Sequence, residues 1–215
     1  MKRRDIIKSL SLLPFAGGIV GSILSPQSVK ASPSGKKRDL FKELGVRTFI
    51  NAAGTLTFMT GSLMHDYVLD TINGASKDFC LLDELQDKVG EKIAAMVHSE
   101  SAVVTSGAFS GMTLGLAGVL TGVDQKKIGQ LPHLEGTEMK SEVICQKTHD
   151  IAYNHALMNT GCKIITVETA EDVGKEVNEK TALMHFLNIE ADKGKIMHEE
   201  WVELGKKYNI PTSID

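Results

Sequence analysis

From residue 102 onward, short apolar runs alternate with amphipathic stretches, and this alternation is the feature that most constrains the fold. Short runs rich in β-branched residues predict strands, whereas apolar residues three and four positions apart predict helices. The expected strands are 102–105, 142–146, 163–167, 182–188 and 210–214, and the expected helices are 108–121, 151–159, 170–178 and 198–208. Strands that alternate with helices form right-handed βαβ units. We therefore expect an α/β fold with three α/β/α layers, in which helices cover both faces of a mostly parallel sheet.

Residues 38–101 carry weaker patterns. The run 38–44 predicts a short helix that ends at Gly45, followed by an extended run, 48–51, and a loop that contains glycine. Asp83 and Gln86 have the spacing of a capping box at the start of a helix. Four apolar residues then recur at every fourth position, which indicates one face of that helix: Leu85, Val89, Ile93 and Val97.

The first 31 residues have the features of a twin-arginine export signal. Arg3 and Arg4 precede an apolar stretch, 10–24, and small residues before Ala31 suit cleavage after that position. A retained membrane anchor is the alternative, although the apolar stretch is short for a membrane span. We expect an exported, periplasmic protein without a membrane attachment after cleavage. Its parts would be a linker and N-terminal arm, 32–62, and a larger domain, 63–215.

Charge and cysteine content exclude several classes of protein. Removal of residues 1–31 takes five basic residues and one acidic residue from totals of 24 and 27, which leaves a net charge of −7. No basic stripe remains, so binding to nucleic acid is not expected. The three cysteines, Cys80, Cys145 and Cys162, have no CxxC spacing and predict free thiols rather than a disulfide framework or a zinc site.

Polar residues follow several of the predicted strands, where ligands bind in parallel sheets. Ser106 and Gly107 follow the first strand and open a helix, whose free N–H groups can bind a phosphate. His149, Asn188 and Asp215 lie at the ends of later strands. A phosphate cradle, an imidazole and a carboxylate at one edge are what pyridoxal 5′-phosphate requires, because its pyridine nitrogen needs a carboxylate partner. A nucleotide-binding Rossmann domain is disfavoured, since no GxGxxG follows the first strand.

Several blocks, in order along the chain, resemble one family of enzymes. They are 51–55 (NAAGT), 84–94 (ELQDKVGEKIA), 104–108 (VTSGA), 146–149 (QKTH), 153–156 (YNHA) and 200–208 (EWVELGKKY). Together they are similar to the pyridoxal-phosphate-dependent fold-type-I enzymes related to bacterial selenocysteine synthase (L-seryl-tRNA(Sec) selenium transferase) and D-glucosaminate-6-phosphate ammonia-lyase. The resemblance spans about residues 40–215 and implies the large domain of that fold for residues 63–215.

The resemblance also implies roles for individual residues at the cofactor. Ser106, Gly107 and Ala108 would hold the phosphate of pyridoxal 5′-phosphate, and His149 would stack on its ring. Asp215 would pair with the pyridine nitrogen. No metal ligands are implied.

On the substrate side, Asn51 and Thr55 lie in a segment that approaches the active site in this family. Residues 57–62 (TFMTGS) depart from the His-Thr-Asn-Leu-Gly-Arg-like run of the selenium transferases. With the acidic charge, this departure disfavours a tRNA substrate and favours a small amino-acid-type substrate. The expected reaction is α,β-elimination of the ammonia-lyase type, and a selenium transferase-like or aminotransferase-like activity is the alternative.

In the family, the Schiff-base lysine lies downstream of the aspartate that corresponds to Asp215, the last residue of this sequence. Four lysines precede the final strand and match no catalytic position: Lys193, Lys195, Lys206 and Lys207. We therefore expect the N-terminal part of a longer enzyme, inactive by itself and a homo-oligomer when complete. A non-catalytic remnant, or a subunit that pairs with another polypeptide, is the alternative.

Overall fold

The computed structural model describes residues 38–215. The predicted export signal, residues 1–31, lies outside them. The chain divides into two compact units, Met1–Asp70 and Thr71–Asp215. Within residues 38–215, no helix is both long enough and apolar enough to cross a membrane.

The first unit has little tertiary structure in its described part, 38–70. Its N-terminal helix begins at Leu40 because the Asp39 carboxylate accepts a hydrogen bond of 3.0 Å from the Lys42 amide. None of the residues 38–70 is buried, and the expected extended run 48–51 pairs with no strand. The helices are α2 (Leu40–Glu43), the 3₁₀ helix η1 (Thr57–Met59) and α3 (Asp66–Ala75), which continues into the second unit.

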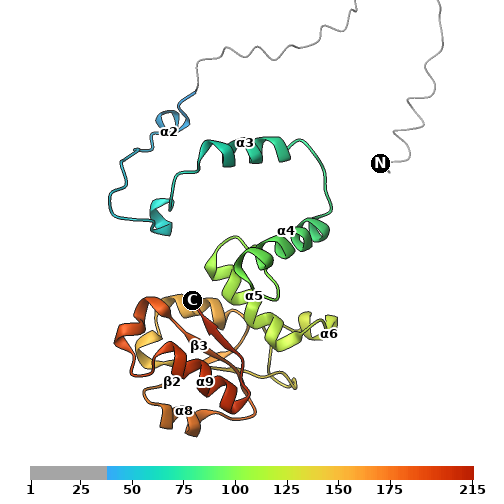
Figure 1. The fold of residues 1–215 in the computed structure, drawn as a ribbon, viewed down its shortest axis with the longest axis vertical. Coiled ribbons are helices and arrows are strands. Elements are labelled where there is room, and N and C mark those ends of the chain that lie inside the picture. The colour runs from blue at the N-terminus through green and yellow to red at the C-terminus, as the bar shows by residue number, and fades with distance from the viewer. Residues whose placement is uncertain (1–37) are drawn as a thin grey trace, which may run out of the picture. The chain divides into compact units, whose positions relative to one another are not determined.

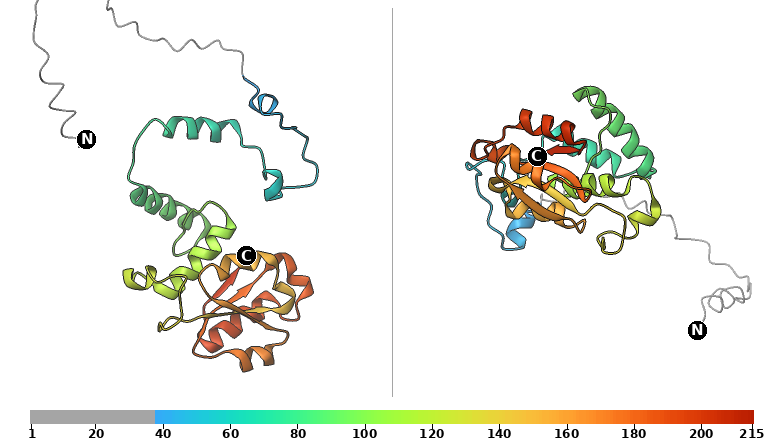
Figure 2. Two further views of the ribbon diagram at one scale, coloured as in Figure 1. Left: turned by 180° about the vertical axis from the view of Figure 1, so that it is seen from behind. Right: turned by 90° about the horizontal axis from the view of Figure 1, so that it is seen from below.

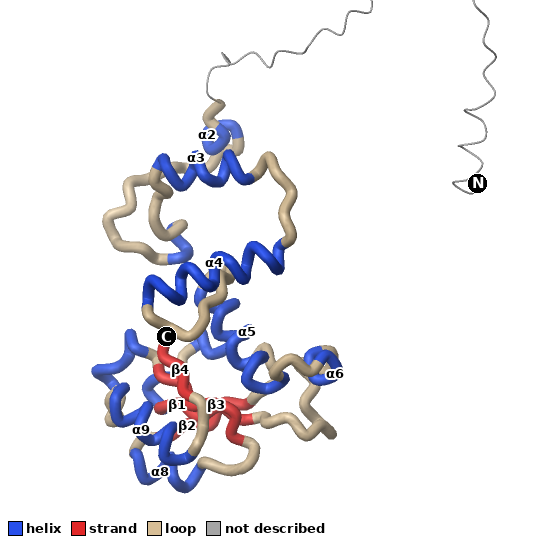
Figure 3. The backbone as a smooth tube through the Cα atoms, turned by 45° about the vertical axis from the view of Figure 1, so that its right-hand side comes forward, coloured by secondary structure: helices blue, strands red, loops and turns tan. Residues whose placement is uncertain are grey.

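The second unit is built on a sheet of four parallel strands in the order β2-β1-β3-β4. Figure 3 shows these strands in red. The strands are β1 (Glu142–Gln146), β2 (Lys163–Val167), β3 (Thr181–Phe186) and β4 (Thr212–Ile214). All six residues of β3 are buried, as expected of a central strand that is covered on both faces.

The second unit also contains helices, several of which flank the sheet (Figure 1). The α-helices are α4 (Leu82–Val97), α5 (Ala108–Thr121), α6 (Gln125–Ile128), α7 (His155–Met158), α8 (Ala170–Glu176) and α9 (His198–Tyr208). The 3₁₀ helices are η2 (Lys147–His149), η3 (Ala152–Asn154) and η4 (Asn188–Lys193). Most of them directly precede or follow a strand, as βαβ connections require.

Two apolar clusters show which helices cover which face of the sheet. Leu116 of α5 and Leu157 of α7 pack with Val143 of β1 on one face. On the other face, Trp201 of α9 packs with Phe186 of β3 and with residues of α8. Figure 2 shows the strands between these two groups of helices. The predicted three-layer α/β/α fold is therefore confirmed.

The segment 102–105 is not the strand that its apolar run predicts. It has no partner strand in the described sheet, and its backbone pairs with a side chain instead. The Gln86 amide donates to the Val104 carbonyl at 2.7 Å, and its oxygen faces the Val104 amide at 3.4 Å. The Gln86 side chain thus binds the backbone 18 residues later and does not cap α4, so the predicted capping box is wrong. Helix α4 begins one residue before Asp83, with Leu81 at its N-cap and no capping side chain.

All three cysteines are free thiols, as predicted. Cys80 is exposed, whereas Cys145 and Cys162 are buried in the sheet region. Burial raises the pKa of Cys145 to about 12, with a smaller contribution from the nearby charge of Asp150. Cys145 is therefore a protonated core residue at neutral pH.

Candidate functional site

The carboxyl ends of the four parallel strands lie at one edge of the sheet, and the polar residues gather there. β1 leads into η2, which ends at His149, and β3 leads into η4, which begins at Asn188. Asp215 follows β4 directly. The parallel topology therefore brings to one edge three of the residues predicted from strand ends.

The start of α5 offers backbone donors to an anion. Gly107 is the N-cap residue with φ +149°, a backbone conformation that favours glycine, and no side chain caps the helix. The Thr105 hydroxyl donates to the Gly107 carbonyl at 2.8 Å, and the hydroxyls of Ser106 and Ser110 lie 2.8 Å apart. The N–H groups of the first turn, which begins at Ala108, therefore have no side-chain acceptor in the cap. This is the donor set that a phosphate needs.

Asp215 is held by backbone pairing at the end of β4. Its amide donates to the Phe186 carbonyl at 3.0 Å, and its own carbonyl accepts from the Asn188 amide at 2.8 Å. Asp215 lines a cavity of about 320 Å³ together with Gly111 and Met112, in the first turns of α5. Asp215 therefore lies beside α5, the helix whose start carries the predicted phosphate cradle. Ser106 itself lines a different depression along α5.

His185 shares the Asp215 cavity, and the sequence patterns did not identify it. Its imidazole is buried, and its Nδ1 lies 2.9 Å from the Ser213 hydroxyl. Its Nε2 is buried without a hydrogen-bond partner among residues 38–215. Burial lowers the pKa of His185 to about 4, although the nearby Asp215 carboxylate acts in the opposite direction. A neutral ring with one unused nitrogen therefore stands next to Asp215.

His149 lies at the predicted edge but is fully buried. The Leu187 amide donates to its Nδ1 at 3.2 Å, so Nε2 carries the proton and donates to the Glu190 carbonyl at 3.1 Å. Its ring meets Phe186 edge to face, at 4.6 Å between centroids. Burial lowers the pKa of His149, and the hydrogen bond to Glu190 partly offsets this. Stacking on a ligand requires an open ring face, and the described residues cover the ring of His149. Its hydrogen bonds connect the end of β1 to Leu187 and Glu190, which follow β3. The role of His149 at a cofactor stays a prediction.

Asn51 and Thr55, the predicted substrate-side residues, lie in the first unit. The Asn51 amide donates to the Gly54 carbonyl at 2.7 Å, and its side-chain oxygen accepts from the Ala53 amide at 3.0 Å. Asn51 thus holds its own turn together. The role of both residues at a substrate stays a prediction.

The three layers and the parallel strand order define an α/β/α fold, and a solved structure shares that fold over most of this chain. A solved structure titled D-glucosaminate-6-phosphate ammonia-lyase matches with a TM-score of 0.77 at 24% identity, over 84% of this chain and 51% of that one. No family model matches the chain.

Two curated proteins are similar in sequence. D-glucosaminate-6-phosphate ammonia lyase of Salmonella typhimurium (strain 14028s / SGSC 2262) is 24% identical over 188 residues, 82% of this chain and 50% of that protein. The 5′-C-glycyluridine monooxygenase-decarboxylase of a Streptomyces species is 23% identical over 189 residues, 81% of this chain and 47% of that protein. The predicted resemblance to the ammonia-lyase is thereby confirmed, and the chain spans about half the length of the curated relatives it matches.

Proposed function

We propose that this chain supplies the phosphate and pyridine contacts of a pyridoxal 5′-phosphate enzyme that acts on a small amino-acid-type substrate. The reaction we propose is α,β-elimination of the ammonia-lyase type. The observation that carries the proposal is the cavity that Asp215 shares with the first turns of α5. The similarity to D-glucosaminate-6-phosphate ammonia lyase supports the choice of reaction.

Two groups of residues along α5 suit the two ends of this cofactor: the start of the helix for its phosphate, and Asp215 for its pyridine nitrogen. The uncapped start of α5 offers N–H donors for a phosphate, and the Ser106 hydroxyl lies at the same turn. The Asp215 carboxylate suits a protonated pyridine nitrogen. The buried His185 Nε2, which has no partner in the described part of the chain, indicates that this cavity lacks a polar group that would satisfy it.

When bound, the protonated pyridine ring withdraws electrons from the substrate α-carbon, which makes that carbon more acidic. The chain's own residues hold and orient the ring in this scheme. Asp215 would keep the proton on the pyridine nitrogen, because its negative charge stabilises the cation that forms when this nitrogen is protonated. The amides of α5 fix the phosphate, and the helix dipole adds to the attraction.

The location, the oligomeric state and the exact reaction of the complete enzyme are further parts of the proposal. We propose that the complete enzyme is exported through the twin-arginine route and forms a homo-oligomer. The similarity to a protein named monooxygenase-decarboxylase favours a second candidate, a different reaction of the same cofactor on an amino-acid-type group. The products of the complete enzyme would separate the two reactions, since elimination releases ammonia and a keto acid whereas decarboxylation releases carbon dioxide.

Binding can be tested on the 215-residue chain with pyridoxine 5′-phosphate, which has the ring and phosphate of the cofactor but no aldehyde. In ¹⁵N spectra we expect amide shifts at Ser106–Ser110 and at Asp215 during titration. Pyridoxine, which lacks the phosphate, should bind much more weakly because it cannot use the start of α5. Equal affinities for the two compounds, or no shift at Ser106–Ser110, would contradict the proposed site.

Replacement of Asp215 by asparagine should weaken the binding of pyridoxine 5′-phosphate about tenfold or more, because a charge-assisted hydrogen bond is lost. The amide still accepts a hydrogen bond, so the loss measures the charge itself. Asp87→Asn, a matched substitution at an exposed position of α4, should leave the dissociation constant unchanged. An unaltered affinity in Asp215→Asn would remove Asp215 from the site.

A further inference from the structure

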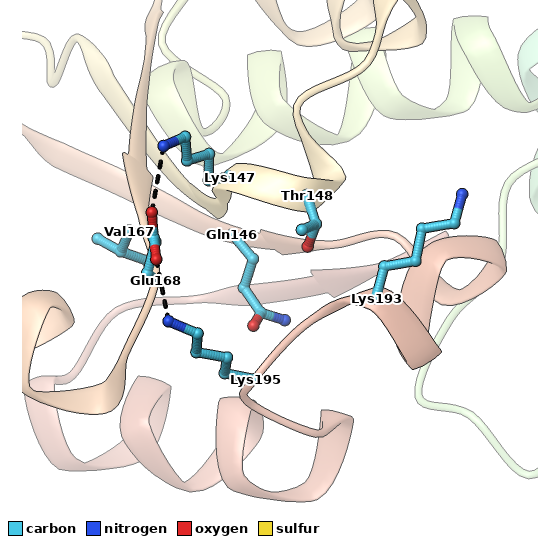
Figure 4. Close-up of a pocket in the computed structure, with 7 residues that line it drawn as sticks. All are labelled: Gln146, Lys147, Thr148, Val167, Glu168, Lys193 and Lys195. Atoms are coloured by element: carbon cyan, nitrogen blue, oxygen red, sulfur yellow. Dashed lines mark hydrogen bonds and ion pairs between the residues drawn. The ribbon is translucent and has the colours of Figure 1, made fainter.

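A second cavity lies at the ends of β1 and β2, and three lysines surround it (Figure 4). We propose that it binds the phosphate group of a small substrate; the assignment to substrate rests on the proposed function, whereas the anion site itself does not. The cavity has a volume of about 290 Å³, and Lys147, Lys193 and Lys195 contribute to its lining with Thr148. None of these residues lines the cavity of Asp215.

A buried amide holds this site in shape. Gln146, at the end of β1, donates to the Ile196 carbonyl at 2.8 Å and accepts from the Ile196 amide at 2.9 Å. The chain passes so close that a Cβ on Gly194 would lie 2.6 Å from the Gln146 amide nitrogen. Lys193 and Lys195 flank Gly194. The contacts of Gln146 therefore fix the lysine-bearing loop against β1, so that Lys195 lies opposite Lys147 without the aid of a ligand.

The charges around the cavity favour an anion. Glu168, directly after β2, accepts from Lys147 at 3.2 Å and from Lys195 at 3.0 Å. These two lysines lower the pKa of the Glu168 carboxyl, which is therefore ionised at neutral pH. Lys193 forms an ion pair with Glu190. Asp192 also acts on Lys193, so the charge of Lys193 is balanced locally. Lys147 and Lys195 share the single carboxylate of Glu168, which leaves an excess of one positive charge at that end of the cavity.

The lysines can exchange their carboxylate partners for a ligand at little cost. Their side chains are more than half exposed, and exposed ion pairs contribute little to stability because water screens the two charges. A phosphate monoester carries up to two negative charges and accepts several hydrogen bonds at once, so it can bind Lys147 and Lys195 together. In Figure 4, the Thr148 hydroxyl lies between Lys147 and Lys193, where it can donate as well. A phosphate group fits this arrangement better than an uncharged substrate end.

The test uses the full 215-residue chain and inorganic phosphate, with chloride at equal ionic strength as the reference. We expect phosphate to shift the amides of Lys147, Thr148 and Lys195 in ¹⁵N spectra. Lys147→Met should raise the dissociation constant for these shifts about three- to tenfold. Glu168→Gln should lower it about two- to threefold, because it removes a negative charge and releases both lysines. Lys163→Met, at the opposite end of β2, is the matched control and should change nothing.

Opposite effects of the two charge substitutions separate an anion site from a structural ion pair. If Lys147 and Glu168 only stabilise the fold, both variants lower the melting temperature and neither changes phosphate affinity, and the inference is wrong. Phosphate shifts confined to Ser106–Ser110 would also overturn it, since that turn belongs to the proposed cofactor site. Conversely, lysine-dependent phosphate binding in a chain that does not bind pyridoxine 5′-phosphate would retain this site and reject the proposed function.

Discussion

Replacement of Trp201 by alanine is expected to lower the free energy of unfolding by about 3–5 kcal/mol, the range for loss of a large aromatic side chain from a core. Trp201 is fully buried between α9 and the sheet, and its ring centroid lies 6.3 Å from that of Phe186. Its cluster includes Ile144 of β1 and Val173 of α8, so the cavity would open between two layers. Urea unfolding followed by circular dichroism measures the loss without relying on indole fluorescence.

Trp201→Phe is the matched control. The indole Nε1 is buried and has no hydrogen-bond partner within the described structure, so phenylalanine sacrifices no polar contact. We expect Trp201→Phe to cost about 1–2 kcal/mol, from the smaller ring alone. An alanine variant as stable as the phenylalanine variant would mean that α9 does not cover this face of the sheet.

The helix that carries Trp201 illustrates what local sequence predicts well. The apolar spacing of Trp201, Leu204 and Tyr208 predicts a helix over 198–208, and α9 has those bounds. Trp201 and Leu204 are buried and Tyr208 packs against the same cluster, as predicted. The strands 142–146 and 163–167 and the helix 108–121 also match their predictions, because each pattern ends at a glycine or at a polar residue. The spacing of apolar residues is enough to predict a helix or strand that buries one face against the core.

Predictions fail where a distant part of the chain satisfies the backbone. Residues 102–105 have the composition of a strand, yet Gln86, 18 residues earlier, supplies their hydrogen bonds. The same contact explains the error at the capping box, since a spacing rule considers only near neighbours. The predicted buried face of α4 is also wrong. The buried residues of this helix are Gly90 and Ala94, whereas Leu85 and Val97 are exposed.

Some residues of the candidate site could likewise be predicted from the sequence, and others could not. Asp215 could be placed at the cavity edge from the sequence, because every parallel strand ends at the same side of the sheet. The burial of His149 could not be predicted, since its partners, Leu187 and Glu190, are 38 and 41 residues away. His185 was missed because a histidine within an apolar strand resembles any other core position. Its one visible clue is a hydroxyl residue, Ser213, two positions before the terminal aspartate.

The buried His185 is expected to make the protein less stable in mild acid. Its pKa is about 4 in the folded state, against an ordinary value of 6.5, so the unfolded chain binds the proton more readily between these values. Stability is therefore unaffected by this group above about pH 6.5 and falls as the pH decreases towards 4. A pKa difference of this size corresponds to a loss of about 3 kcal/mol by pH 4.

His185→Gln isolates this contribution, because glutamine keeps a hydrogen-bonding group near Ser213 and cannot take up a proton. Urea unfolding at pH 7 and at pH 4.5 should show a smaller loss of stability in this variant than in the wild type. His155→Gln, at an exposed position, should retain the wild-type loss. His149, whose pKa burial also lowers, contributes equally to both proteins and cancels in the comparison. An unchanged pH dependence in His185→Gln would mean that His185 takes up a proton as readily in the folded protein as in the unfolded chain, and that its burial does not lower its pKa.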